Sequence, residues 1–374
     1  MILALAVLTV LIWAFLLAGR GFFWVMREAV LPRALPAPPP RVAAVTPARN
    51  EAATIAAAAG SLLAQDYAGP FKVIVVDDHS TDGTAQQARM PGVSVVSARP
   101  LPSGWTGKVW AMSEGLTAAA AFEPDYVLFA DADIVLPPDS LSTLVSQAQS
   151  GAYHLVSLMV KLRCHTFAEK LLIPAFVFFF LKLYPPAWVR DPRRRTAGAA
   201  GGCLLVRAAT LTKIGGMAAI RGEVIDDCAL ARAVKRAGGG VWLGLAGEQR
   251  SLREYPTLAD AGRMISRTAF TQLRYSTPRL LGAVAGMALT YLAPPLLLAA
   301  GGVPAALGAL AWALMTAAYI PALRLYRLSP LWALALPLAA LFYTGATVSS
   351  ALRYWRGRGG SWKGRFQAPG RDGN

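Results

Sequence analysis

Five acidic residues of this 374-residue chain each follow a short apolar run: Glu51, Asp77, Asp78, Asp131 and Asp133. Carboxylates that meet in one cleft repel each other unless a cation lies among them. Mg²⁺ and Mn²⁺ prefer oxygen ligands, and Mg²⁺ held by one or two carboxylates usually completes its shell with substrate phosphates. The pattern therefore predicts a divalent-metal site for a phosphorylated substrate, although each acid taken singly could instead cap a helix.

The elements that would position these acids alternate along the chain. Unbroken apolar runs are typical of a parallel sheet buried on both faces, in which ligands bind beyond the carboxyl ends of the strands. No G-x-G-x-x-G follows the first run and no G-x-x-x-x-G-K-[ST] occurs, which disfavours a nicotinamide-binding domain and a P-loop. We expect a doubly wound α/β sheet with strands at 42–46, 73–77, 93–97 and 126–130, separated by helices at about 50–64, 81–89, 107–121 and 138–149.

The composition indicates a membrane protein with a basic surface. Only 16% of the residues are charged, against about 25% in average soluble domains. The net charge of +16 predicts contact with phosphates of lipids or nucleotides. Nucleic acid is not an expected partner, because the basic residues flank apolar segments and form no patch interleaved with aromatic residues. The three cysteines and three histidines lack the spacing of a disulfide framework or a zinc site.

An uncharged segment at 2–19 is long enough to cross a membrane once. A cleaved signal peptide is the alternative, but the basic residues follow this segment instead of preceding it. They place the N-terminus outside and the following chain in the cytoplasm. We expect residues 1–22 to form an N-terminal transmembrane anchor and residues 23–40 to form a Pro-rich linker.

A C-terminal transmembrane region is expected at 280–352, with spans at about 280–300, 303–323 and 328–352. A basic tail follows at 353–374. Three crossings from a cytoplasmic domain leave this tail outside, whereas its charges indicate the inside. Either one apolar run is re-entrant, or the charge rule fails for this chain.

A fourth apolar stretch, at 171–189, lies within the expected soluble part and is followed by the basic cluster RDPRRR at 190–195. A true span here would put the two halves of the soluble domain on opposite sides of the membrane. We expect 171–195 to form an interfacial helix whose basic cluster lies on anionic headgroups. A helix buried in the protein core is the alternative.

Three motifs, in this order, resemble the GT-A fold of family 2 glycosyltransferases: PARNE at 47–51, VVDDHSTDGT at 75–84 and DAD at 131–133. The resemblance covers about 41–275, interpreted as a GT-A glycosyltransferase domain. It implies a Rossmann-like mixed sheet flanked by helices, with one N-terminal and two to three C-terminal transmembrane helices. The most similar subfamily is that of the hopanoid-biosynthesis-associated (hopene-associated) glycosyltransferases, related to ceramide glucosyltransferases. Further matching segments are GWTGK at 104–108, Gly201-Gly202-Cys203, EVIDD at 223–227 and WKGR at 362–365.

The resemblance implies a donor sugar carried on a nucleoside diphosphate, and it assigns residues to that donor. Asp133 is expected to bind Mg²⁺ or Mn²⁺ directly, while Asp131 serves as a second ligand or orients water or the sugar. The metal would offset the charge that grows on the departing diphosphate. Lys108 would meet a phosphate, or it is simply an exposed lysine at a helix start. The donor-binding set is Pro47, Arg49, Glu51, Asp77, Asp78, Lys108, Asp131, Gly202, Arg267, Gln272 and Arg274.

The resemblance also identifies Asp227 as the general base that takes the proton of the acceptor hydroxyl, with Asp226 as the second choice. Attack from the face opposite the diphosphate would invert the anomeric carbon. Asp227 could in addition cap a helix that begins near it.

One segment departs from the family pattern. Processive members and ceramide glucosyltransferases carry Gln/Arg-x-x-Arg-Trp, whereas this chain has Gln272-Leu-Arg274-Tyr275, which is one residue shorter and has Tyr for Trp. A polysaccharide synthase and a strict ceramide-type site are therefore disfavoured. Arg267, Gln272 and Arg274 could still cover the diphosphate, or they make surface pairs at the membrane.

The leading prediction is an inverting, metal-dependent glycosyltransferase that moves a sugar from a nucleotide-diphosphate sugar to a membrane lipid, either a hopanoid or a sphingolipid-like lipid. We expect a multi-pass protein of the cell (inner) membrane with a cytoplasmic catalytic domain. A polyprenyl-phosphate glycosyltransferase is one alternative, and the arginines at 193–195 would suit its phosphorylated acceptor. Another is a non-catalytic membrane scaffold or transport subunit with a relic GT-A domain, whose acids could be neutralised without effect.

Overall fold

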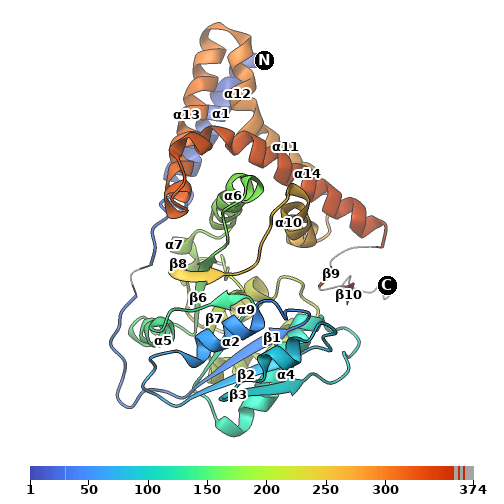
Figure 1. Ribbon diagram of the computed structural model, residues 1–374. Helices are drawn as coiled ribbons and strands as arrows, with labels where there is room; N and C mark the ends of the chain where they lie inside the picture. Colours follow the sequence, from blue (N-terminus) through green and yellow to red (C-terminus); the bar gives the residue numbers. More distant parts are fainter. Residues whose placement is uncertain (30, 358–360, 363–364, 367–374) are drawn as a thin grey trace. The chain divides into compact units, whose positions relative to one another are not determined.

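A computed structural model describes residues 1–29, 31–357, 361–362 and 365–366 of the chain (Figure 1). The chain divides into two compact units. The helical unit contains the described residues of Met1–Arg27, Arg163–Trp188 and Glu254–Gly360. The α/β unit contains the described residues of Glu28–Leu162, Val189–Arg253 and Ser361–Asn374.

This division differs from the expected domain at 41–275. Residues 163–188 and 254–275 group with the apolar helices and not with the sheet. The expected linker, from Glu28 onward, belongs to the α/β unit, where Leu31 and Leu35 pack against the core. The sheet is thus built from the residues of the α/β unit alone.

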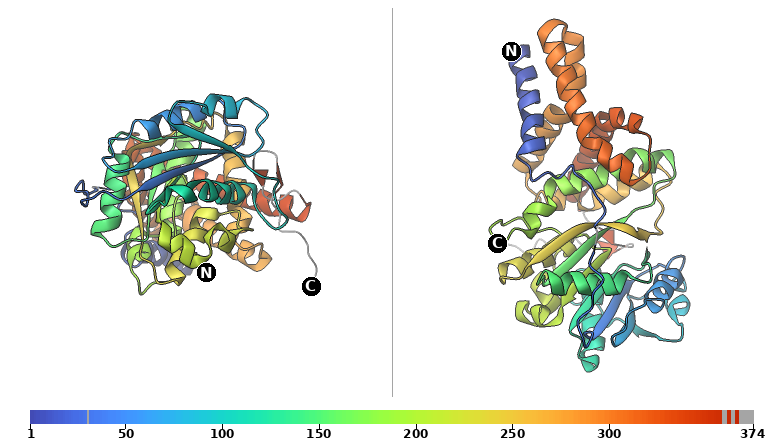
Figure 2. Two further views of the ribbon diagram at one scale, coloured as in Figure 1. Left: turned by 90° about the horizontal axis from the view of Figure 1, so that it is seen from below. Right: turned by 90° about the vertical axis from the view of Figure 1, so that its left-hand side faces the viewer.

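The α/β unit contains an eight-stranded sheet in the order β3-β2-β1-β4-β7-β6-β8-β5. Figure 2 gives two further views of the ribbon, coloured along the sequence. The first four strands in chain order pair in parallel, whereas β7 is antiparallel to both β4 and β6. The mixed α/β sheet predicted from the sequence is therefore confirmed. The strands are β1 (Val42–Ala48), β2 (Phe71–Asp77), β3 (Val93–Ser97), β4 (Tyr126–Ala130), β5 (Ile134–Val135), β6 (Leu155–Lys161), β7 (Cys203–Arg207) and β8 (Val241–Ser251).

Helices cover both faces of this sheet. All seven residues of β1 are buried, as expected for a central strand that pairs with β2 and β4. Ala48 packs with helix α2, whereas Val45 faces helix α4. Since alternate residues of a strand point to opposite faces, α2 and α4 lie on opposite sides of the sheet. The helices of this unit are α2 (Ile55–Leu63), α3 (Thr84–Ala88), α4 (Gly107–Ala119), α5 (Ser140–Ser150), α8 (Ala208–Ile214) and α9 (Asp226–Arg236), with 3₁₀ turns η1 (Ala120–Phe122) and η2 (Gly216–Ile220).

A separate antiparallel pair, β9 (Ser361–Trp362) and β10 (Arg365–Phe366), carries the ends of the WKGR motif. Lys363 and Gly364 of that motif lie outside the described residues. Most of the expected basic tail at 353–374 does so as well.

The helical unit contains four described helices that are long and apolar enough to cross a membrane: Phe167–Arg190, Thr277–Ala300, Gly302–Leu325 and Pro330–Trp355. The last three fall where the sequence predicts the C-terminal region. The unit is built from α1 (Ile2–Ala18), α6 (Phe167–Leu183), α10 (Leu258–Gln272), α11 (Thr277–Met287), η3 (Ala288–Leu292), α12 (Ala293–Leu296), η4 (Leu297–Ala300), α13 (Gly302–Leu325), η5 (Pro330–Ala335) and α14 (Leu336–Trp355), while α7 (Pro186–Arg190) joins the two units.

Helix α6 packs inside the helical unit and contacts α10, α13 and α14. In the helix Phe167–Arg190, 56% of the most apolar 18-residue segment is buried, against 17–33% of the corresponding segments in the three C-terminal helices. The interfacial helix expected at 171–195 stays a prediction, as does its alternative of a helix buried in the protein core. The shorter α1 packs along α13.

Candidate active site

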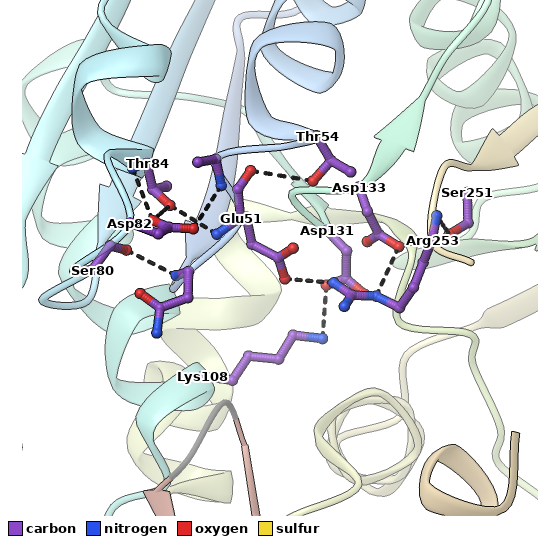
Figure 3. Close-up of polar contacts among 12 residues, drawn as sticks. Glu51, Thr54, Ser80, Asp82, Thr84, Lys108, Asp131, Asp133, Ser251 and Arg253 are labelled. Carbon is purple, nitrogen blue, oxygen red and sulfur yellow. Dashed lines mark hydrogen bonds and ion pairs between the residues drawn. The ribbon is translucent and has the colours of Figure 1, made fainter. Parts of the chain in front are cut away.

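The loops that follow β1 and β2 are joined by hydrogen bonds at the carboxyl edge of the sheet (Figure 3). The Asn50 main-chain N–H donates to Ser80 Oγ (3.0 Å), and Asn50 Oδ1 accepts from the Thr81 N–H (2.9 Å). The Glu51 N–H donates to Thr84 Oγ1 (2.8 Å). The two motifs, whose bonded residues lie 30 to 33 positions apart in the sequence, thus form one platform.

The residues expected to bind the nucleoside lie on this platform. Pro47 is buried within β1, beyond the point where pairing with β4 ends. Asp78 is fully buried, and its Oδ2 lies 3.6 Å from Arg49 Nη1. Asp77 Oδ2 accepts from the Ser80 N–H, while Asp77 Oδ1 is buried and has no hydrogen-bond partner among the described residues. An unpartnered buried oxygen is costly unless a ligand donates to it, so Asp77 is suited to meet a base or ribose donor.

A second group gathers three carboxylates around Lys108 at the start of α4. Lys108 Nζ lies 2.8 Å from Asp131 Oδ1 and 3.3 Å from Asp226 Oδ2. Burial opposes the ammonium charge, but these carboxylates outweigh it and raise the pKa of Lys108 above its usual value. Lys108 is therefore charged at every physiological pH, and it is not the exposed lysine of the alternative interpretation.

Hydrogen bonds of Thr106 join the start of α4 to the segment that leads into α9. The N–H of Thr106, the residue before α4, donates to the Arg221 carbonyl oxygen (2.8 Å), and Thr106 Oγ1 donates to the Glu223 carbonyl oxygen (3.3 Å). Asp226 and Asp227 form the first turn of α9, preceded by Ile225 at the cap position. The expected cap role of Asp227 is therefore wrong: both acids lie inside the helix, where its positive end favours negative charge.

Asp227 is the member of this group that is suited to exchange a proton. Its Oδ1 accepts a 2.6 Å hydrogen bond from the Cys228 N–H. Burial and the neighbouring Asp226 carboxylate raise the pKa of Asp227 to about 6, against the opposing effect of Lys108. A carboxylate with a pKa near the operating pH is an effective general base.

Two glycines leave room for this group. A Cβ added at Gly201 would lie 3.2 Å from Asp227 Oδ2 and 3.3 Å from Lys108 Nζ. The next residue, Gly202, accepts from the Asp131 N–H and packs against Val160, so it positions the backbone of the site. A side chain at Gly201 would crowd both the acid and the ammonium.

Asp133 belongs to a third group, on the other side of Ala132 from Asp131. Its Oδ2 accepts from Ser251 Oγ (2.6 Å) and from Arg253 Nε (3.3 Å). The same guanidinium donates through Nη2 to Glu51 Oε1 at 2.5 Å, as Figure 3 shows. Asp133 and Glu51 are thus held by one arginine.

Sequence reasoning missed Ser251 and Arg253. They follow the long strand β8, and the pairing of Ser251 with Ile134 of β5 brings them beside Asp133. This pairing spans more than a hundred residues and no motif marks it. The apolar run at 241–245, followed by polar and charged residues, is the signal that could have pointed to another strand end.

The five acids of the first prediction therefore do not surround one ion. Among the described residues, no three acidic, histidine or cysteine side chains are grouped so that they could hold a metal by themselves. Mg²⁺ needs only one or two carboxylates when phosphates complete its shell, and the oxygen donors of Asp131 and Asp133 suit that chemistry. The residues present fit a metal that binds together with a diphosphate, so Asp131 and Asp133 stay the predicted ligands.

Arg267, Gln272 and Arg274 belong to the helical unit. Arg267 is exposed on α10, and Gln272 Nε2 donates to the Tyr184 hydroxyl (2.7 Å). Arg274 is exposed just after α10, with a left-handed φ of 54°. Their expected contact with the diphosphate stays a prediction.

Comparison with known proteins places this site in a family context. Residues 38–264 match the family model described as "Glycosyltransferase like family 2". A 4,4'-diaponeurosporenoate glycosyltransferase of Staphylococcus aureus (strain USA300) is 38% identical over 107 residues, a match that covers 28% of this chain and 27% of the relative's length. A mannosyltransferase from Pyrobaculum calidifontis, solved in complex with GDP-Man and Mn²⁺, gives a TM-score of 0.56 at 20% identity and covers 95% of this chain and 99% of that chain. At that identity the likeness shows a shared fold.

Proposed function

Because the chain belongs to the family 2 glycosyltransferases, we propose that its α/β unit moves one sugar, with inversion, from a nucleoside-diphosphate sugar to a membrane lipid. The observation that carries this proposal is the group of Lys108, Asp131, Asp226 and Asp227 at the carboxyl edge of the sheet. It combines a permanent cation for a phosphate with a carboxylate that titrates near neutral pH.

The proposed reaction needs one proton acceptor. Asp227 takes the proton of the acceptor hydroxyl as that oxygen bonds to the anomeric carbon, while the bond from that carbon to the diphosphate breaks. A single base on the acceptor side, with the leaving group on the opposite face, gives inversion. Asp226 lies close to Lys108 and raises the pKa of Asp227, so it supports the base in this scheme.

Donor binding uses the other residues of the platform. Asp77, Asp78, Arg49 and Pro47 are proposed to hold the nucleoside, with the free oxygen of Asp77 accepting from a base or ribose donor. Lys108 meets the diphosphate as a point charge. Mg²⁺ or Mn²⁺, bound through Asp133 and Asp131, would stabilise the negative charge of the departing diphosphate.

The acceptor is proposed to be a membrane lipid. The four long apolar helices support a multi-pass membrane protein, and the basic residues that follow the first apolar segment support a cytoplasmic catalytic unit. The similar S. aureus protein is named for 4,4'-diaponeurosporenoate, and the sequence motifs resemble hopanoid-associated enzymes. We propose a hopanoid as the first acceptor to test, with the carotenoid acid second.

The test is sugar transfer by the full chain purified in detergent. Radiolabelled UDP- and GDP-sugars are supplied with a hopanoid, a carotenoid acid or a polyprenyl phosphate, with Mn²⁺ or with EDTA. The proposal predicts a glycolipid of inverted configuration with one of the two non-phosphorylated lipids, lost with EDTA. A product only from the polyprenyl phosphate would replace the acceptor assignment. Equal activity of the wild type and the Asp227→Asn variant would indicate that another group is the base. If no donor gives a product, the result favours the alternative of a non-catalytic membrane scaffold.

A further inference from the structure

Two cations of the helical unit lie in an environment made of aromatic rings and backbone. Lys182, near the end of α6, donates from Nζ to the Tyr291 hydroxyl at 2.7 Å. The ammonium also lies 4.6 Å from the Tyr291 ring centroid and 5.4 Å from that of Phe179. Aromatic faces stabilise a cation, but they do not neutralise it.

Arg20, which follows α1, lies beside Lys182. Its Nε donates to the Lys182 carbonyl oxygen (3.0 Å), and its guanidinium carbon lies 4.6 Å from the centroid of the Trp188 ring. A guanidinium has five N–H donors and an ammonium has three. Each cation therefore keeps N–H groups beyond those that these contacts occupy.

The acids of the helical unit are engaged elsewhere. Glu169 accepts from the backbone N–H groups of His165, Thr166 and Tyr255. Glu254 pairs with Arg163, and Asp260 pairs with Arg263. No ion pair joins Arg20 or Lys182 to any carboxylate of the described chain.

A local distortion fixes the Tyr291 hydroxyl under Lys182. Pro294 and Pro295 lack the N–H groups that would bond to the carbonyls of Thr290 and Tyr291. The helix adopts a π-turn here (η3), and the Thr290 carbonyl oxygen instead accepts from Trp13 Nε1 at 2.9 Å. Tyr291 is fully buried, so its position is defined by packing. Such π-turns are frequent at functional sites.

We propose that Arg20 and Lys182 form a binding site for the phosphodiester of an anionic membrane lipid. Two neighbouring cations in apolar surroundings repel each other and are costly without a counter-ion, and ionisable groups within an apolar bundle usually mark a site of function. A lipid phosphodiester supplies the missing negative charge and the hydrogen-bond acceptors. The site stands on the helical unit alone, so it does not depend on the sugar-transfer proposal.

The test measures lipid binding and not activity. The full-length protein in non-ionic detergent is titrated with phosphatidylglycerol, phosphatidylcholine or inorganic phosphate, and bound ligand is counted by native mass spectrometry. We expect the wild type to retain one phosphatidylglycerol selectively. Lys182→Met and Arg20→Gln should each weaken this binding roughly fivefold, the usual contribution of one cation near anionic lipid.

Matched variants separate the site from general charge effects. Lys170→Met removes a lysine from the same helix and should leave binding unchanged, and Lys182→Arg keeps the charge and should retain the lipid. Phosphatidylglycerol should raise the thermal midpoint of the wild type and of Lys170→Met by more than it raises that of Lys182→Met. This shift is compared within each protein, so it stays informative if a variant is less stable.

Three outcomes would overturn the proposal. The first is equal phosphatidylglycerol binding by the wild type, Lys182→Met and Arg20→Gln. The second is binding of inorganic phosphate without the lipid, which would identify a site for a free anion. The third is an equal loss of binding in Lys170→Met, which would reduce the effect to net charge.

Discussion

The two aspartates on either side of Ala132 lie in different electrostatic surroundings. On one side, Asp131 joins Asp226 and Asp227 around the single ammonium of Lys108. On the other side, Asp133 and Glu51 share the guanidinium of Arg253, and Ser251 donates a further hydrogen bond. The Lys108 group has an excess of two negative charges, whereas the Arg253 group has an excess of one. In the first group, burial and the neighbouring Asp226 raise the pKa of Asp227, which can take a proton. In the second group, the two carboxylates are held by ion pairs with Arg253.

The largest effect is expected from Asp227→Asn. Removing a general base typically costs ~10²–10⁴-fold in rate, so transfer should fall by this factor while donor affinity is retained. Initial rates and calorimetric donor binding measure the two quantities. Asp66→Asn, an exposed change in the same unit, is the control and should behave as the wild type. Lost donor binding in Asp227→Asn would instead give Asp227 a structural role.

Substitutions in the group of Asp133, Glu51 and Arg253 should change the binding of the metal. Asp133→Asn is expected to lower the Mn²⁺-dependent part of donor affinity by roughly ten- to a hundredfold, in the range known for residues that support a metal. Arg253→Met removes a cation from beside Asp133 and should tighten the binding of Mn²⁺ alone severalfold. Electron paramagnetic resonance counts free Mn²⁺ directly. Unchanged Mn²⁺ binding in both variants would refute Asp133 as a ligand.

A smaller effect is expected at Gly201. The methyl group of Gly201→Ala would press on Asp227 and Lys108, and overpacking of this kind costs about 1–3 kcal/mol. If about 1.4 kcal/mol of this cost is felt in the transition state, we expect the turnover number to fall about tenfold. Gly60→Ala is the matched control, because its added Cβ meets its nearest atom at an ordinary 3.8 Å. Equal turnover of both variants would mean that Asp227 and Lys108 are not confined at this point.

The smallest effect concerns stability. The pKa of Asp227 is about 6 in the folded protein, above its ordinary 3.8, so the folded state favours the neutral acid. Its stabilising contribution is therefore present below about pH 4 and is lost as the pH rises through 6. Asp227→Asn stays neutral and should be more stable than the wild type at pH 7.5, by about 1–3 kcal/mol, with the difference closing near pH 4. Thermal unfolding at the two pH values measures this, and a variant less stable than the wild type at pH 7.5 would contradict it.

Much of the sheet could be predicted from the sequence because its strands are local apolar runs. The runs at 93–97 and 126–130 coincide with β3 and β4, and β1 and β2 are each two residues longer than expected. Helices α2 and α3 are shorter than predicted, since both begin only after the loops that carry the polar motifs have been closed by hydrogen bonds. Local pattern therefore identified which elements exist, and non-local bonds set where they begin.

The grouping of the acids could not be predicted in the same way. The expectation of one shared ion rested on acids at neighbouring strand ends, but the structure supplies Lys108 and Arg253 as internal counter-ions. Arg253 reaches Asp133 only through the long-range pairing of β8 with β5. Asp131 and Asp133 lie in the turn between β4 and β5, and this turn places them in two different groups.

The central claim is that Asp227 is the base and that Lys108 holds its pKa near 6. The most direct test is the pH dependence of kcat/KM, measured for the wild type and for Lys108→Met. This parameter reports the pKa values of groups in the free enzyme. The account predicts an acidic limb near pH 6 for the wild type and, because the ammonium lowers the pKa of Asp227, a limb about one unit higher in the variant. A limb near pH 4, or one that does not move in Lys108→Met, would contradict it.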